Sequence, residues 1–378
     1  MPSEENLIKV IVVDDSAFMR KTLTLMLESD PEIRVIATAR NGQDGIDKIG
    51  KLKPDLVTLD IEMPGIDGLA TLKFIMEKMP VPVLMVSALT TEGAQATIQA
   101  LELGAIDFVS KDMSYTPMKT INIKNELIEK VKQIANSRLV QTRFRLKRLV
   151  QASQNRHERV KPISRNVSFG RVVLDFQAVV VGISTGGPLA LLKIIPKIPE
   201  NFPIGMAIVQ HLPLYFTRTL ATRLNSLSNV FVKEAEQGEA IEPGKVMIAP
   251  GGKQMTFSKN GSSVRAEISD GPSNILYRPS VDIMMLSAAE VFQGPLLGII
   301  MTGMGRDGVE GLKRIKSKGG YVIAQDEESC VVYGMPRAAL EEGLVDSMLS
   351  LENISVALDQ LANSRVPAHI SVGRGEGI

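Results

Sequence analysis

Five polar residues follow short apolar runs in the early part of the 378-residue chain. Asp14 and Asp15 end the first run, Asp60 the third and Ser87 the fourth, and Lys111 follows the fifth. If these runs are parallel strands, their carboxyl ends meet at one sheet edge and the five side chains share a pocket. Three adjacent carboxylates repel one another, and bound Mg²⁺ is a common remedy. Asp60 is then a nucleophile for a phosphoryl group that Ser87 and Lys111 help to hold.

A hydroxyl, an imidazole and a carboxylate follow three further apolar runs. Ser184 lies in the turn Ser-Thr-Gly-Gly-Pro, between an apolar run and a helical pattern. Such a strand-to-helix turn exposes a hydroxyl where free backbone N–H groups face a substrate. His211 ends the next predicted strand and supplies the general base, and Asp307 follows a later strand and orients that base. These residues predict a serine hydrolase.

Backbone N–H groups have to stabilise the oxyanion that such a reaction forms. We expect these groups near His211 and Met304, with Thr185 in support. Losing a single donor of this kind typically lowers turnover about a hundred- to a thousandfold.

The same polar residues also fit simpler roles. Ser184 and Asp307 each precede a helical pattern, so either can be the N-cap of that helix. Asp14 and Asp15 can cap the first helix in the same way, and Asp60 can open a turn. The two interpretations differ in what the side chain contacts, because a capping side chain accepts a hydrogen bond from the helix that follows it.

Apolar runs and amphipathic stretches alternate over residues 7–136. The predicted strands are Ile8–Val13, Arg34–Ala39, Leu56–Asp60, Val83–Ser87 and Asp107–Val109. The predicted helices are Phe18–Leu27, Gly42–Ile49, Leu69–Met79, Ala94–Leu103 and Ile121–Ala135. Nearly continuous Val, Ile and Leu in strands that alternate with helices indicate a parallel sheet covered on both faces. The first domain is therefore predicted to be a flavodoxin-like (βα)5 unit.

A second alternation fills residues 175–362. The predicted strands are Ala178–Ile183, Gly205–Val209, Val246–Ile248, Leu297–Met301 and Tyr321–Ala324. The predicted helices are Leu189–Ile195, Phe216–Leu224, Val281–Val291, Val309–Lys318 and Ala338–Glu342. This pattern predicts a doubly wound, mainly parallel α/β domain with ligands at the carboxyl edge of its sheet.

Two stretches lack such a pattern. Residues 137–174 are rich in Lys and Arg, with Glu158 the one acidic residue between positions 138 and 165. We interpret them as a basic linker, either a tether or a helix extension, because interleaved aromatic residues and a reading helix are missing. The Gly-rich stretch 363–378 is predicted to be a flexible tail.

Composition narrows the possible partners. With 43 basic and 42 acidic residues the net charge is +1, so no overall attraction to nucleic acid or anionic lipid is expected. The one cysteine, Cys330, rules out an internal disulfide, and the acidic start is unlike a signal peptide. No apolar run approaches the ~20 residues of a membrane-spanning helix. We therefore expect a cytoplasmic protein without membrane insertion.

Four motifs of the first domain resemble the receiver domain of bacterial response regulators. In order, they are Val12–Ser16, Leu59–Pro64, Val86–Ala88 and Val109–Lys111. The resemblance covers nearly all of residues 7–136. It implies that Asp60 accepts phosphate from a chemotaxis histidine kinase with Mg²⁺ bound in the acidic pocket, and that Phe108 is an aromatic switch.

Six motifs of the second domain resemble the chemotaxis protein-glutamate methylesterases over residues 175–362. They are Ser184–Pro188, Gln210–Pro213, Arg278–Asp282, Thr302–Gly308, Ala324–Asp326 and Tyr333–Pro336. The resemblance implies hydrolysis of glutamate methyl esters on methylated chemoreceptors, with release of methanol. It also implies deamidation of receptor glutamines through an acyl-enzyme at Ser184.

Two positions depart from the family pattern. Gln254 stands where relatives commonly carry His, which leaves the contacts of its loop open. Arg306 stands where Asn is usual, and it puts a cation next in sequence to Asp307.

Three rival functions fit parts of the sequence. The stretch Gly303–Gly308 satisfies G-x-G-x-x-G and Asp326 ends the next strand, as in a dinucleotide-binding oxidoreductase. The turn at Ser184 also matches an α/β-hydrolase elbow, which would require His369 as base. A transcriptional response regulator is the third rival, against which stand the near-zero net charge and the lack of a helix-turn-helix pattern.

Overall fold

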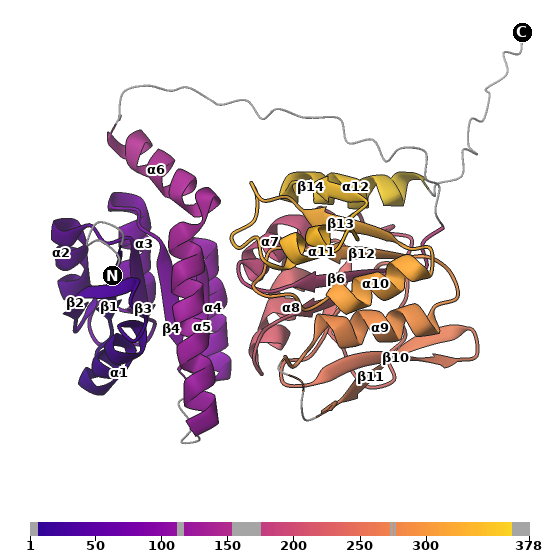
Figure 1. Ribbon diagram of the computed structural model, residues 1–378, viewed down its shortest axis with the longest axis horizontal. Coiled ribbons are helices and arrows are strands. Elements are labelled where there is room, and N and C mark those ends of the chain that lie inside the picture. The colour runs from indigo at the N-terminus through magenta and orange to yellow at the C-terminus, as the bar shows by residue number, and fades with distance from the viewer. Residues whose placement is uncertain (1–6, 112–116, 153–174, 273–274, 276, 365–378) are drawn as a thin grey trace, which may run out of the picture.

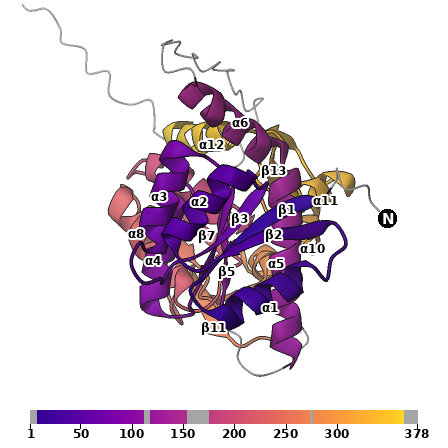
Figure 2. The ribbon, with the colours of Figure 1, turned by 90° about the vertical axis from the view of Figure 1, so that its left-hand side faces the viewer.

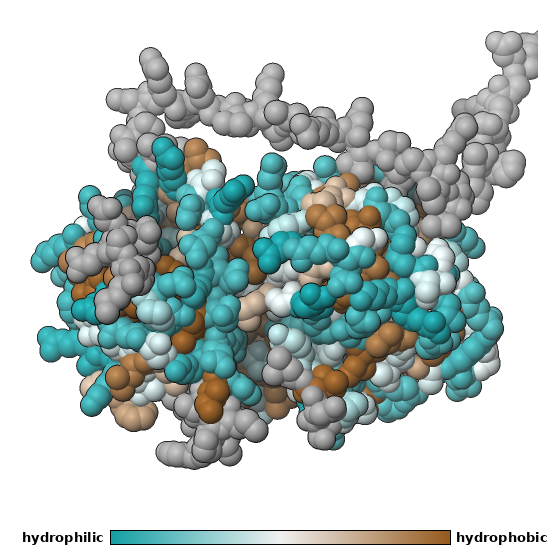
Figure 3. Space-filling model, in the orientation of Figure 1, coloured by the Kyte–Doolittle hydropathy of each residue, from teal (hydrophilic) through white to brown (hydrophobic). Residues whose placement is uncertain are grey.

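Two α/β domains lie side by side in the computed structural model of this protein (Figure 1). The structure describes residues 7–111, 117–152, 175–272, 275 and 277–364. Hydrophilic side chains cover most of the face that Figure 3 presents. Within the described residues, no helix is both long and apolar enough to cross a membrane.

The N-terminal domain has five parallel strands in the order β2-β1-β3-β4-β5. The strands are β1 (Ile8–Val13), β2 (Ile33–Ala39), β3 (Leu56–Asp60), β4 (Val83–Ser87) and β5 (Asp107–Ser110). The helices are α1 (Ala17–Leu27), α2 (Gly42–Leu52), α3 (Gly68–Lys78), α4 (Thr91–Leu103) and α5 (Pro117–Asn136). Helices α1 and α5 pack on one face of the sheet, and α2, α3 and α4 cover the other (Figure 2). The predicted (βα)5 architecture is confirmed.

The C-terminal domain has a seven-stranded parallel sheet in the order β14-β13-β12-β6-β7-β9-β8. Its strands are β6 (Ala178–Ile183), β7 (Gly205–Gln210), β8 (Phe231–Glu234), β9 (Lys245–Ile248), β12 (Leu296–Ile300), β13 (Tyr321–Gln325) and β14 (Ser347–Leu349). An antiparallel hairpin joins β10 (Gln254–Asn260) to β11 (Ser263–Ser269). Every residue of β6, β7 and β12 is buried, which explains their continuous apolar sequence.

Helices cover both faces of this larger sheet (Figure 1). One face carries α7 (Gly187–Ile194), the 3₁₀ turn η2 (Ile195–Lys197), α8 (Phe216–Leu227) and α12 (Leu351–Ser364). The other carries α9 (Val281–Val291), α10 (Val309–Ser317) and α11 (Met335–Glu341), together with the hairpin. The predicted doubly wound, parallel α/β architecture is therefore confirmed.

Some elements decide between alternatives or were not predicted. Helix α6 (Arg138–Ala152) fills the first part of the stretch interpreted as a linker, in agreement with the helix-extension alternative, while residues 153–174 lie outside the described residues. Helix α12 extends to Ser364, so the predicted tail begins two residues too early; positions 365–378 are not described. Strands β8 and β14, at the two sheet edges, contain four and three residues, too few to show a clear period.

The two domains meet through apolar and charged contacts. Helix α4 packs against α7 and α8. The rings of Phe108 and Phe216 stack across the interface, with centroids 4.4 Å apart and an interplanar angle of 9°. The Arg223 Nε atom lies 2.7 Å from Oε1 of Glu102. Buried apolar side chains of the first domain thus form one continuous cluster with those on one face of the seven-stranded sheet.

Candidate phosphoacceptor site and candidate active site

The three predicted acidic residues of the first domain lie together at the carboxyl edge of its sheet. Asp14 and Asp15 follow β1, and Asp60 ends β3. One carboxylate oxygen from each lies within 4.8 Å of the others. Asp14 and Asp60 are buried, whereas Asp15 is exposed. This set of hard oxygen donors, open to water on one side, has the chemistry that Mg²⁺ requires.

Lys111 compensates part of this negative charge. Its Nζ atom lies 2.6 Å from Oδ2 of Asp60 and 3.1 Å from Oδ2 of Asp14. Burial nevertheless raises the pKa of Asp60 to about 6, because loss of hydration outweighs the ion pair with Lys111 and Asp14 repels a second charge. A cation in this pocket would favour the ionised, nucleophilic form of Asp60.

The other two predicted residues of this domain, Ser87 and Phe108, have contacts other than Asp60. The Ser87 hydroxyl donates a hydrogen bond to the carbonyl of Gly93 at 3.1 Å. Phe108 is buried and stacks on Phe216 of the second domain. Lys130 of α5 donates to the Phe108 carbonyl at 2.6 Å and also contacts Asp107 and Glu126, a buried arrangement that sequence reasoning did not predict.

The capping interpretation of Asp14 and Asp15 is wrong. Ser16 is the N-cap of α1, and its hydroxyl accepts a hydrogen bond from the N–H of Met19. The Asp14 carboxylate instead accepts from the N–H of Ser16. Asp60 does order the turn after it, since its Oδ1 accepts from the N–H of Glu62 at 3.2 Å, and its other oxygen faces Lys111.

Ser184 lies directly after β6, at the carboxyl edge of the larger sheet. The next helix begins at Gly187, with Gly186 as N-cap in the left-handed conformation at φ +75°. No side chain caps this helix, so the interpretation of Ser184 as an N-cap is wrong. Gly303 approaches so closely that a Cβ atom there would lie 2.7 Å from the Cβ of Ser184. A hydrogen bond from the Ser184 N–H to the Thr302 carbonyl joins the backbone of the turn to the segment that follows β12.

His211 follows β7 and forms a hydrogen bond with Asp307. The His211 Nε2 atom lies 2.7 Å from Oδ2 of Asp307. Because the carboxylate accepts, the proton of a neutral ring is on Nε2, and Nδ1 carries the free lone pair. Nδ1 is buried and has no hydrogen-bond partner. The ring therefore presents an unused acceptor beside Ser184, as a general base requires.

Asp307 precedes α10 in sequence, but its carboxylate contacts the N-terminus of α9. Its carboxylate accepts from the N–H groups of Val281 and Asp282 and from the hydroxyl of Ser280, at 2.7 to 3.0 Å. Burial acts to raise the pKa of Asp307, but the hydrogen bond and charge of His211 and these backbone donors outweigh it, so the pKa is lowered. The N-cap of α10 is Gly308, without a side-chain cap, so the interpretation of Asp307 as an N-cap of the helix that follows it is also wrong.

Two backbone donors beside Ser184 are unused. Among the described residues, no hydrogen-bond acceptor contacts the N–H of Thr185 or of Met304. The N–H of His211, by contrast, bonds to the Ile183 carbonyl and is not available to a substrate. The expected donors are therefore limited to those at Thr185 and Met304.

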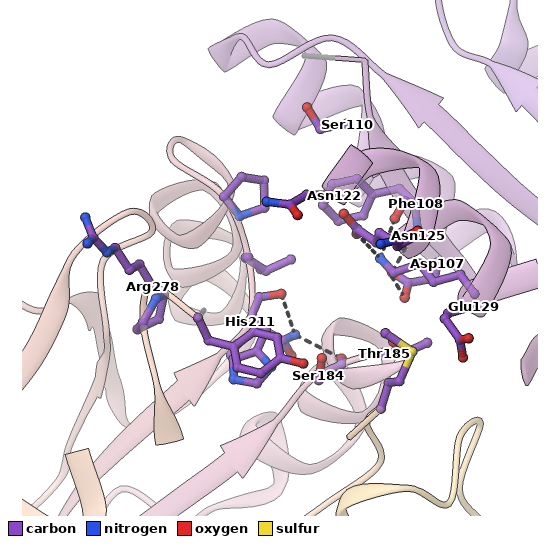
Figure 4. A pocket seen from close by; sticks show the side chains of 18 residues that line it. Asp107, Phe108, Ser110, Asn122, Asn125, Glu129, Ser184, Thr185, His211 and Arg278 are labelled. Carbon is purple, nitrogen blue, oxygen red and sulfur yellow. Dashed lines mark hydrogen bonds and ion pairs between the residues drawn. The ribbon is translucent and has the colours of Figure 1, made fainter. Parts of the chain in front are cut away.

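A cavity of about 420 Å³ separates the two domains at this site (Figure 4). Ser184, Thr185, His211, Tyr277 and Met304 line it from the second domain. The first domain closes the opposite side with Phe108, Asn122, Asn125, Glu126 and Lys130. The predicted switch residue and the predicted nucleophile thus border one space.

The two departures from the family pattern have separate structural roles. Gln254 is fully buried; its amide donates to the Tyr277 carbonyl at 2.7 Å and accepts from the Ser280 N–H at 2.8 Å. Arg306 is exposed and pairs with Glu342 at 2.6 Å. Its charge is directed at that carboxylate on α11–β14 and not at the His211 ring.

One rival prediction loses support here, and a second is not tested. Asp307 binds His211 and the start of α9, and Asp326 bonds within its own turn to Ser329, so neither is free for a dinucleotide. The alternative base, His369, lies outside the described residues.

Sequence reasoning missed three residues around the base: Tyr277, Ser280 and Gln254. Tyr277 lies on a loop and Gln254 begins β10, so neither carries a strand-end or helical signal, whereas Ser280 is the N-cap of α9. The signal available for Tyr277 and Ser280 was the Arg278–Asp282 motif, since Tyr277 immediately precedes it and Ser280 is part of it.

The chain resembles known proteins over almost its whole length. The family described as CheB methylesterase matches residues 179–358, and the response regulator receiver domain matches residues 10–121. A protein-glutamate methylesterase/protein-glutamine glutaminase of Oleidesulfovibrio alaskensis is 46% identical, covering 93% of this chain and 98% of the relative. A relative from Nitratidesulfovibrio vulgaris with the same activities in its name is 45% identical, over 93% of this chain and 98% of the relative. Another, from Pyrococcus abyssi, is 46% identical, over 94% of this chain and 93% of the relative. The chain belongs to the family of CheB methylesterases that carry a response regulator receiver domain.

Proposed function

We propose that this protein is a phosphorylation-controlled protein-glutamate methylesterase that demethylates chemoreceptors and also deamidates receptor glutamines. The observation that supports this proposal best is the His211–Asp307 hydrogen bond, which leaves Nδ1 free in a cavity that Ser184 also lines. Relatives about 45% identical are named for both activities.

In the proposed reaction, Ser184 attacks the carbonyl carbon of a glutamyl methyl ester. His211 Nδ1 takes the hydroxyl proton, and Asp307 stabilises the imidazolium through Nε2. The N–H groups of Thr185 and Met304 donate to the oxyanion of the tetrahedral intermediate. Its collapse releases methanol, which receives the proton from His211, and leaves an acyl-enzyme. Water activated by the same imidazole then releases glutamate; a glutamine substrate follows the same path with ammonia as leaving group.

The hydroxyl of Ser184 does not contact Nδ1 in this structure, because that nitrogen has no hydrogen-bond partner. Catalytic hydrogen bonds are often long before substrate binds and tighten in the reacting complex.

We propose that Asp14, Asp15 and Asp60 hold Mg²⁺ during phosphorylation by a chemotaxis histidine kinase. When bound, the ion supplies positive charge that offsets the repulsion between the carboxylates and the incoming phosphoryl group. Asp60 accepts the phosphoryl group, and Lys111 places its ammonium beside a phosphoryl oxygen. Ser87 must exchange its bond to Gly93 for one to the phosphoryl group.

Control follows from the cavity shared by the two domains. In the unphosphorylated protein the first domain covers the Ser184 side of the cleft, so a receptor segment cannot enter. Phosphorylation must favour an open state, and a complete reversal of the equilibrium requires about 5.5 kcal/mol. Phe108 is the direct link, because it joins the phosphorylated domain to α8 through Phe216.

Methanol release from a methylated receptor fragment tests the proposal. The native chain, Ser184→Ala and Asp60→Ala are compared with and without acetyl phosphate and Mg²⁺. Ser184→Ala should remove the activity, while Asp60→Ala should retain basal activity but lose the response to acetyl phosphate. Ser258→Ala, on the surface hairpin, is the matched control and should behave as native. Full activity of Ser184→Ala would refute the proposal.

A further inference from the structure

Tyr277 lies flat against the His211 ring. The two ring centroids are 4.4 Å apart and the planes differ by 4°. Tyr277 also lines the cavity at the cleft. Burial raises the pKa of the Tyr277 phenol, and the negative charges of Asp307 and, to a lesser extent, Glu126 raise it further. The Tyr277 ring that stacks on His211 is therefore neutral at physiological pH.

The His211 ring has few other restraints. Of its two nitrogens, Nε2 bonds to Asp307 and Nδ1 has no hydrogen-bond partner. A single hydrogen bond lets an imidazole tilt, since the second side-chain torsion of His has a broad energy minimum. A parallel aromatic surface at van der Waals distance limits that tilt.

The chain holds Tyr277 in place through Gln254. The buried Gln254 amide donates to the Tyr277 carbonyl at 2.7 Å and accepts from the Ser280 N–H at 2.8 Å. Both bonds join one side chain to the same short turn. Gly271 packs against the Gln254 side chain so closely that a Cβ atom at that position would lie 2.4 Å from Cγ.

The same turn also holds the acid that orients the base. Ser280 and the first two N–H groups of α9, at Val281 and Asp282, bind the Asp307 carboxylate. One segment, residues 277–282, therefore contacts the face of the His211 ring at its first residue and fixes the ring's partner Asp307 at its last three.

We propose that Tyr277 is a positioning residue for the general base, and that Gln254 acts as the clamp that sets it. The Tyr277 ring fixes the plane of His211 so that Nδ1 faces Ser184. Its π face also stabilises the imidazolium that forms during acylation. The aromatic ring carries this role and the phenolic hydroxyl does not. This inference rests on the proposed function, because it assigns His211 as the base.

Steady-state kinetics on the full chain test the inference with Tyr277→Phe, Tyr277→Leu and Tyr277→Met. Loss of the ring should lower kcat roughly tenfold, the upper range for an aromatic or cation–π contact, and leave KM within roughly twofold. Tyr277→Phe should stay near the native kcat. Tyr321 is the first residue of β13 and so lies at the amino end of that strand, whereas the site lies at the carboxyl edge of the sheet. Tyr321→Leu therefore serves as control for a general loss of packing.

A spectroscopic measurement gives a readout that a merely structural role would not change. The chain has three histidines, so labelling them with ¹³C at Cε1 yields three resonances, and His211→Gln assigns one of them. The His211 resonance should move in Tyr277→Leu and Tyr277→Met, which lose the ring current, and stay in Tyr277→Phe. A native far-UV circular dichroism spectrum and a native urea midpoint show that a variant is folded.

The outcomes separate the inference from the proposed function. A native kcat in Tyr277→Leu, or a loss in Tyr277→Phe as large as in Tyr277→Leu, overturns the role of the ring. An unmoved His211 resonance in Tyr277→Leu overturns the stacking. Full activity in Ser184→Ala would instead overturn the hydrolase mechanism, whatever the Tyr277 variants do.

Discussion

The acidic pocket of the receiver domain and the hydrolytic cleft are both built at the carboxyl edge of a parallel sheet, but different parts of the chain hold their side chains. Asp14, Asp60 and Lys111 come from strand ends or the residues next to them, and they contact one another directly. His211 and Asp307 also follow strands, yet the turn 277–282 outside the sheet orients them. Sheet topology alone thus places the side chains of the first site. In the second site it places His211 and Asp307 near each other, and the turn 277–282 sets their orientation.

The two sites also differ in what they lack. The receiver pocket has an excess of negative charge, which burial makes costly at Asp60. In the second site the base His211 is paired with Asp307, and the missing element is a hydrogen-bond partner for Nδ1 of His211. In the proposed function, a cation and a phosphoryl group would complete the first site, whereas substrate and withdrawal of the covering domain would complete the second.

The largest effect is expected at Asp307. Asp307→Asn should lower kcat by roughly 10⁴, because an amide that donates to Nε2 selects the wrong tautomer of His211. Methanol release measures the loss. Arg306→Ala is the neighbouring control and should stay close to native, since Arg306 is exposed and pairs with Glu342. Equal losses in both variants would show that the loop, and not the carboxylate, is required.

A smaller effect is expected at Asp60 in the absence of divalent cations. Its pKa of about 6 lies above the ordinary 3.8, so the folded state binds the proton more tightly than the unfolded state does. That stabilisation is present below pH 3.8 and is lost as pH rises through about 6. Asp60→Asn should therefore be more stable than native by roughly 1–3 kcal/mol at pH 7, with little difference at pH 4.

Urea unfolding of the receiver domain in EDTA at both pH values measures this difference. Asp47→Asn, which removes an exposed carboxylate of α2, is the control and should show no such pH dependence. A native-like midpoint for Asp60→Asn at pH 7 would mean that burial does not strain this carboxylate.

The smallest effect is expected at the interface. Glu102→Ala removes the interdomain ion pair with Arg223, and the basal activity of the unphosphorylated chain should rise by up to about fivefold as the cleft opens more often. Glu341→Ala breaks a pair with Arg337 inside α11 and should leave basal activity unchanged. Lower activity in Glu102→Ala would mean that the contact supports catalysis and does not restrain it.

The sequence was sufficient for most of the fold and for the residues at strand ends. Continuous apolar runs identified the central strands, and the convergence of their carboxyl ends brought His211 and Asp307 together. The hairpin was missed although Asn260-Gly261, between two alternating stretches, is a recognised turn signal. Tyr277 and Gln254 were not identifiable, because a stacked ring and a backbone clamp between loops leave no periodic pattern.

The most direct test of the account is the rate at which a fluorophosphonate modifies Ser184, followed by mass spectrometry with and without acetyl phosphate and Mg²⁺. This rate reports both the activation of the hydroxyl and the opening of the cleft. We expect one modification per chain at Ser184, faster after phosphorylation in the native protein, not accelerated in Asp60→Ala, and nearly absent in His211→Ala. Modification of Ser184 at the same rate in His211→Ala, or a rate that phosphorylation of the native chain leaves unchanged, would contradict it.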